Sequence, residues 1–119
     1  MSTTTGFDND RAKAFTHRVV GDMAGAVALH LSVIGDRLGL FKDLAQHGPA
    51  DAEQFAKRTG IQARYALEWL EALAAAEYLE FDPDTNQFSL PAEHQRPLAE
   101  ESHPLFQGNM RNLLAYGMG

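Results

Sequence analysis

The chain has 119 residues, a formal net charge of −6 and no cysteine. This length suits one compact domain, and the lack of cysteine excludes disulfides, thiolate zinc sites and cysteine nucleophiles. The negative charge disfavours a polyanionic partner. Residues 1–6 are polar and lack the basic and apolar regions of a secretory signal, so we expect a cytoplasmic protein, and we expect residues 1–9 to be a disordered N-terminus.

Residues 10–38 predict a long helix, or two helices, with an extensive apolar surface. Asp8, Asn9 and Asp10 stand at its start as candidate N-caps, and Gly39 follows it as the expected C-cap. Large apolar side chains recur every three or four residues and form one apolar stripe: Phe15, Val19, Met23, Val27, Leu31 and Ile34. Other small and aliphatic residues widen it until the helix is apolar nearly all round, whereas an ordinary surface helix has a polar back.

Something else must cover such a helix near the end of a small domain. We interpret residues 10–38 as a dimerisation segment, with an interface made of Val19, Met23, Val27, Leu31 and Ile34. The alternative is a central core helix wrapped by its own domain. Gly21, Gly25 and Gly35 lower the helix propensity and mark a kink or a close approach of another helix. The longest apolar run, 23–35, is shorter than the roughly 20 residues that span a bilayer, so we expect no membrane partner.

Residues 39–90 predict a winged helix-turn-helix. A short apolar helix from Leu40 stops before Gly48, a second helix starts near Asp51, and a third presents Trp69 on its buried face. We interpret Trp69 as a core anchor rather than a base-stacking residue. Two runs alternate apolar and polar residues with period two and are expected to pair as the wing, namely 78–81 and 87–90.

A winged helix usually indicates DNA binding, because its recognition helix fits the major groove. Here residues 51–90 carry eight acids against three cations, a balance that would repel phosphates. On the recognition helix, Glu68 and Glu71 lie on the exposed face, and Arg64 is expected to pair with Glu68. We therefore expect no nucleic-acid partner. A small DNA-binding regulator remains the alternative, since Lys57, Arg58 and Arg64 cluster near the turn.

Residues 91–119 predict a helical linker. A helix starts at Pro91 and is expected to be interrupted at Pro97, and 110–116 form a last apolar segment. The expected fold class is therefore mainly α with a small β wing. In this fold a winged helix-turn-helix is preceded by a long apolar N-terminal helix and followed by a C-terminal helical linker.

The sequence contains no constellation for catalysis, cofactor binding or metal binding, and we assign no residue to these roles. Its histidines fall in different expected elements and never at metal-ligand spacing: His17, His30, His47, His94 and His103. No glycine-rich nucleotide loop follows a strand. His30 lies in the most apolar part of the first helix, where it either makes a hydrogen bond within an interface or faces a ligand cavity.

Several segments follow one another in an order that resembles a known family. They are 33–45, 48–50, 53–60, 64–70 and 74–79, followed by the wing. Together they resemble the N-terminal winged-helix (dimerisation) domain of class I S-adenosylmethionine-dependent methyltransferases, in the bacterial and mycobacterial small-molecule group. The resemblance covers residues 19–106.

The resemblance implies a homodimer whose first helix helps to close the pocket of a small-molecule methyl acceptor, with Met23 and His30 as substrate-lining residues. The family's catalytic domain is absent from this chain. Its cofactor loop would lie beyond Gly119, so we expect S-adenosylmethionine only in the full-length protein and no cofactor in this chain. The parent protein would be a methyltransferase and this chain alone non-catalytic. A stand-alone dimeric module that binds an apolar small molecule is a further alternative.

Overall fold

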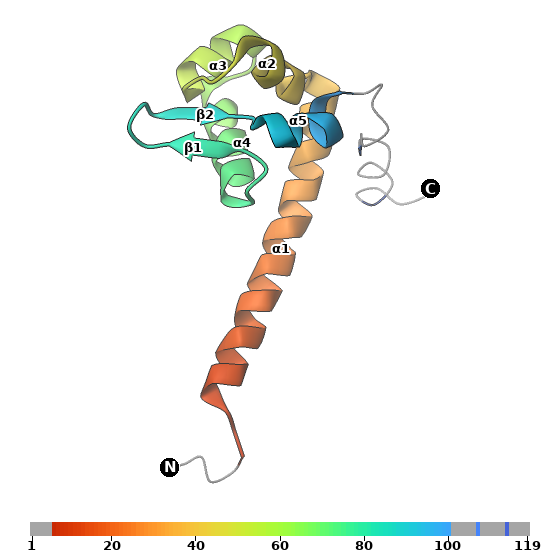
Figure 1. The fold of residues 1–119 in the computed structure, drawn as a ribbon, viewed down its shortest axis with the longest axis vertical. Helices are drawn as coiled ribbons and strands as arrows, with labels where there is room; N and C mark the ends of the chain where they lie inside the picture. Colours follow the sequence, from red (N-terminus) through yellow and green to blue (C-terminus); the bar gives the residue numbers. More distant parts are fainter. Residues whose placement is uncertain (1–5, 101–106, 108–113, 115–119) are drawn as a thin grey trace.

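The computed structural model describes residues 6–100 together with Gln107 and Leu114. Within them, one long helix projects from a small body that contains the winged helix-turn-helix (Figure 1). The elements in chain order are α1 (Asn9–Leu38), α2 (Leu40–His47), α3 (Ala52–Thr59), α4 (Ala63–Ala75), β1 (Glu80–Asp82), β2 (Gln87–Ser89) and α5 (Ala92–Ala99). The expected fold class, mainly α with a small β wing, is confirmed.

Helix α1 is one continuous helix of 30 residues, bounded by the caps that the sequence predicts. The Asp8 side chain accepts a hydrogen bond from the Arg11 backbone N–H, and Gly39 ends the helix in the left-handed conformation at φ 72°. Residues 1–5 lie outside the described residues. Only the part of α1 from Ala28 onward packs against the body, and its buried residues are Ala28, Ser32, Val33 and Gly35. The rest extends away from the body (Figure 1).

The core of the body is built around the Trp69 indole of α4, which is 4% exposed. Its ring stacks on Phe55 of α3 at a centroid distance of 5.7 Å and packs at 5.1 Å against Phe41 of α2. Its Nε1 donates a hydrogen bond to the Leu31 carbonyl of α1 at 2.9 Å. Trp69 therefore contacts three other helices, and its predicted role as a core anchor is confirmed.

Local signals explain where α3 begins and ends. Asp51 and Gln54 form a capping box, in which each side chain satisfies the other residue's backbone N–H. Gly60 ends the helix in the left-handed conformation at φ 78°. Just before the cap, Ala50 forms a β-bridge with Phe88, so the start of α3 is tied to the wing.

The wing is shorter than the sequence predicts. Strands β1 and β2 pair antiparallel with Phe81 opposite Phe88, but β1 begins at Glu80 rather than at residue 78. The backbone N–H groups of Tyr78 and Leu79 both bond to the Leu73 carbonyl. These two residues therefore close the end of α4, and they are not available to a strand.

The expected interruption of the helix at Pro97 is wrong. The helix includes Pro97 and continues to Ala99. Leu98 and Ala99 are buried in the core, and this burial offsets the hydrogen bond that proline cannot donate. The expected apolar segment 110–116 lies outside the described residues, apart from Leu114.

Gly35 is a position where only glycine fits. A Cβ there would lie 2.6 Å from Cζ2 of Trp69, whereas a Cβ at Gly21 would meet nothing within 4 Å. We expect Gly35→Ala to lower the free energy of unfolding by about 1–3 kcal/mol, because the clamped indole cannot move aside. The matched control Gly21→Ala is expected to raise it by up to about 1 kcal/mol through helix propensity. Urea denaturation followed by circular dichroism measures both, and equal effects would contradict the explanation.

Candidate functional site: an uncovered apolar helix and its flanking grooves

The projecting part of α1 exposes large apolar side chains to solvent. Phe15 and Met23 are both 64% exposed, Val27 is 56% exposed and Val19 is 39% exposed. They stand four residues apart along α1, so they lie on the same side of the helix. This part of α1 is therefore not a core helix covered by the described residues of its own chain.

The structure divides the five predicted interface residues into two groups. Val19, Met23, Val27 and Ile34 are exposed and available to a partner. Leu31 is half-buried because it packs against the core of its own body, and its carbonyl accepts the Trp69 hydrogen bond. The apolar stripe thus begins on the free rod and ends against the body.

One apolar groove continues the stripe where α1 meets α4. This α1–α4 groove has a volume of about 390 Å³. Leu40 and Trp69, both buried, lie at its floor, and the exposed side chains of Ile34, Leu38 and Tyr65 stand at its edges. Glu68 is its one acidic lining residue.

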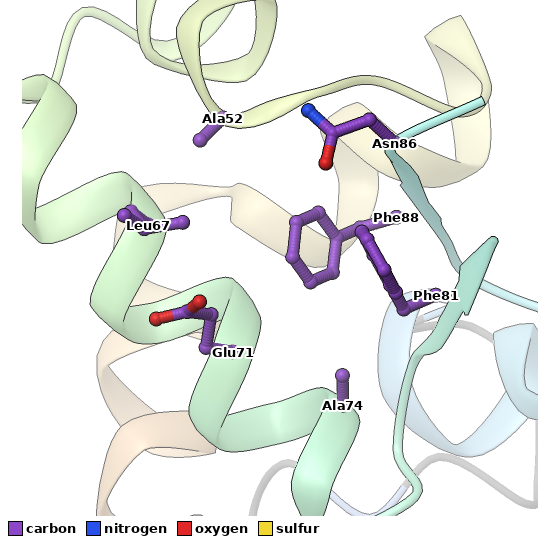
Figure 2. Close-up of a pocket in the computed structure, with 7 residues that line it drawn as sticks. All are labelled: Ala52, Leu67, Glu71, Ala74, Phe81, Asn86 and Phe88. Carbon is purple, nitrogen blue, oxygen red and sulfur yellow. The ribbon is translucent and has the colours of Figure 1, made fainter. Parts of the chain in front are cut away.

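A second groove lies between α4 and the wing. Its volume is about 270 Å³, and we call it the wing groove. Figure 2 shows Leu67, Glu71 and Ala74 of α4 on one side and Phe81, Asn86 and Phe88 of the wing on the other. The Phe81 and Phe88 rings pack at a centroid distance of 4.7 Å. The two grooves therefore lie on different sides of α4.

A third pocket, of about 470 Å³, lies beside α5. Leu29, Tyr78 and Leu98 contribute apolar surface to it. The His94 ring also lines it and is oriented by a hydrogen bond between Nδ1 and the Tyr78 carbonyl at 2.8 Å. Sequence reasoning missed His94, because its partner is 16 residues away and no local pattern indicates the contact.

The two predicted substrate-lining residues lie outside these three pockets. Met23 belongs to the exposed stripe, and His30 is exposed two turns further along α1. The Nδ1 atom of His30 lies 3.0 Å from the Ala26 carbonyl of the preceding turn. Because residues seven apart share a helix face, a partner covering the stripe would meet Met23 and His30 together.

Comparison with known families identifies the body and the adjoining half of α1. Residues 25–100, more than half of the chain, match the Rv2258c-like winged HTH domain. The chain belongs to this family. No match is found among curated proteins. Phe15, Val19 and Met23 precede the matched residues, so most of the exposed rod lies outside the family domain.

Two solved structures share the fold. "PigF with SAH" matches with a TM-score of 0.68 and 27% identity, covering 84% of this chain and 29% of that chain. The mitomycin 7-O-methyltransferase MmcR matches with a TM-score of 0.67 and 22% identity, covering 90% of this chain and 31% of that chain. The present chain thus spans less than a third of the length of either protein.

The cations of the winged helix are mostly engaged within the chain. Arg58 donates to the Asp43 carboxylate at 2.7 Å and to the carbonyls of His47 and Gly48, and both charged side chains are largely buried. Arg64 pairs with Glu68 at 3.3 Å, as predicted. Within residues 51–90, all of which the structure describes, only Lys57 is then left as an unpaired cation.

Helix α1 also meets the length and composition of a membrane-spanning helix, with a window of mean hydropathy 1.3. The helix is longer than the apolar run 23–35 considered in the sequence, which explains the difference from our expectation. One such helix is weak evidence for a membrane span, because core helices of soluble proteins and signal sequences pass the same test.

Among the described residues, no group of three or more His, Asp or Glu could hold a metal ion.

We expect the chain not to bind duplex DNA specifically. The eight acids of residues 51–90 face three cations, of which Arg58 and Arg64 are already paired. Phosphate contacts supply most non-specific affinity, with dissociation constants typically about 10⁻⁴–10⁻⁶ M, and this surface lacks them. An electrophoretic shift assay at about 100 mM salt measures the affinity of the chain for duplex DNA. Sub-micromolar, sequence-dependent binding would contradict the prediction and favour the regulator.

Proposed function

We propose that this chain is the dimerisation and substrate-capping domain of an S-adenosylmethionine-dependent methyltransferase. The observation that carries the proposal is the exposed apolar stripe on a projecting helix. Monomeric soluble proteins rarely expose a large contiguous apolar patch, and such patches mark interaction sites. Membership of the Rv2258c-like winged HTH family and the likeness to PigF and MmcR support the methyltransferase context.

In this proposal the chemistry belongs to a catalytic domain outside the 119 residues. A class I cofactor site needs a parallel sheet with a glycine-rich turn at its switch point. Residues 6–100 form a single sheet, which has two antiparallel strands. S-adenosylmethionine would therefore bind the catalytic domain. This chain would supply the surface that contacts the partner subunit and one wall of the acceptor pocket.

The dimer is tested by placing a charge in the stripe. We expect the 119-residue chain to be a dimer at tens of micromolar, and Val27→Asp to be a monomer. Burying each large apolar side chain contributes roughly 1.5–3 kcal/mol, which a buried carboxylate would oppose. The matched control is Gly21→Asp, which adds the same carboxylate six residues before Val27, about 1.7 turns away and off the stripe.

Light scattering measures the mass of all three proteins. The control is expected to stay dimeric, because nothing lies within 4 Å of a Cβ at Gly21 in the single chain, and that position is off the stripe. A wild-type monomer at tens of micromolar would contradict the dimerisation proposal. A dimer that Val27→Asp leaves intact would move the interface away from the stripe.

The capping role is tested in the longer protein that the proposal implies, in which a glycine-rich loop follows a strand beyond Gly119. We expect His30→Ala there to change the turnover of the methyl acceptor. The affinity for S-adenosylmethionine is expected to stay within about twofold, because in this proposal the cofactor binds the catalytic domain and His30 lies outside it. Steady-state kinetics with both substrates varied separates the two effects. Unchanged acceptor turnover would make His30 an interface residue only.

A further inference from the structure

We propose that the tip of α1 from a second copy of the chain docks in the α1–α4 groove, with the Phe15 side chain as its anchor. The tip is residues 9–20. This inference rests on the proposed dimer and adds its direction and its central contact. Both subunits would make the contact, since a two-fold dimer repeats it.

The tip has the properties of an anchor. Phe15 is 64% exposed and lies in a region where the body offers nothing to cover it. Arg11 and Arg18 stand four residues before it and three residues after it, so both flank the ring on the same helix face. Aromatic side chains, phenylalanine among them, and arginines are enriched at protein–protein interfaces relative to the rest of the surface.

The groove has the properties of a receptor for one aromatic ring. Its volume of about 390 Å³ lies near the lower end of ligand pockets, which run from about 300 to 1,000 Å³. Its floor is preorganised, because the hydrogen bond between Trp69 and the Leu31 carbonyl holds the indole in place. Leu31 and Ile34 belong to both the stripe and the groove. Any helix that covers the stripe to its end must therefore also cover the groove.

The anchor cannot come from the same chain. Phe15 and the groove residue Leu38 are 23 residues apart on one continuous helix, a separation of about 35 Å. Only a second α1 that runs in the opposite direction brings a tip to the groove. The centre of such a pair lies between Met23 and Val27, in the middle of the exposed stripe.

Charge favours this antiparallel arrangement. The tip carries three cations against one acid, whereas the rest of the chain carries seven cations against fifteen acids. A parallel pair would place the two basic tips together and the two acidic bodies together. An antiparallel pair instead places each basic tip beside a body of net negative charge. Glu68, the acidic residue that lines the groove, pairs with Arg64 in the single chain at 3.3 Å, so the attraction comes from the overall charge of the body. The antiparallel pair also places the partially positive N-terminal end of each helix beside the partially negative C-terminal end of the other.

Disulfide trapping tests the contact in a chain that has no cysteine of its own. Ala12→Cys, one turn before Phe15, is combined with either Ile34→Cys or Leu38→Cys, so that two registers are covered. The bond forms only when the two Cα atoms approach within about 7 Å, and within one chain these positions are more than about 30 Å apart. The control combines Ala12→Cys with Leu67→Cys of the wing groove, and Ala12→Cys alone reports a parallel pair.

We expect a covalent dimer from one of the two groove pairs, none from either control, and loss of the cross-link when Phe15→Ala is added. Cross-linking by Ala12→Cys alone, or a dimer in light scattering that neither groove pair traps, would overturn the docking while leaving the dimer intact. A monomeric wild-type chain would overturn both proposals. The failure of each is therefore recognisable by itself.

A second measurement does not depend on cysteine. We expect Phe15→Ala to raise the dimer dissociation constant at least about tenfold. Losing one buried side chain already corresponds to such a change, and a two-fold dimer loses two. Phe7→Ala is the matched control, because Phe7 is equally exposed at 65% but lies before the helix. Its effect is expected to stay within about twofold. Sedimentation at several concentrations measures both constants, and equal weakening would remove Phe15 as the anchor.

Discussion

The contact between the Trp69 indole and the last third of α1 determines the arrangement of this molecule. The ring is held by Phe41 and Phe55 on the body side, and its Nε1 bonds to the Leu31 carbonyl on the helix side. The absence of a Cβ at Gly35 lets the helix approach the ring closely. Because the indole is fixed from both sides, the direction of α1 is fixed too, and the remainder of a 30-residue helix must project from the body.

The projecting part of α1 leaves large apolar side chains uncovered. A helix in water is stabilised mainly by packing of its apolar face, and the part of α1 before Ala28 receives no such packing from the body. Phe15, Met23 and Val27 remain uncovered, and the stripe leads into a groove whose floor is the same Trp69. One aromatic residue thus both anchors the rod and shapes the surface on which we propose that a second rod ends.

The winged helix-turn-helix fold does not by itself indicate DNA binding, because function depends on the residues that the fold presents. Arg58 is committed to the Asp43 carboxylate and to the end of α2, and Arg64 is paired with Glu68. What remains on this surface is mainly acidic, which disfavours the phosphates of a duplex. In the dimer that we propose, the same charge would attract the basic tip of α1 from the second copy.

Much of the fold could be predicted from the sequence because its signals are local. Asp8, Asp51, Gly39 and Gly60 cap their helices through neighbours a few residues away, and the period of apolar residues places Trp69 in the core. The candidate interface followed from the same period. Four of its five residues are exposed, and that they meet a partner stays a prediction.

Tertiary structure decided what depends on distant partners. Leu31 turned inward because Trp69, 38 residues away, lies over it. Helix α5 continued through Pro97 because Leu98 and Ala99 meet the core. The α1–α4 groove exists only where two helices far apart in the sequence converge, and no local pattern encodes that meeting.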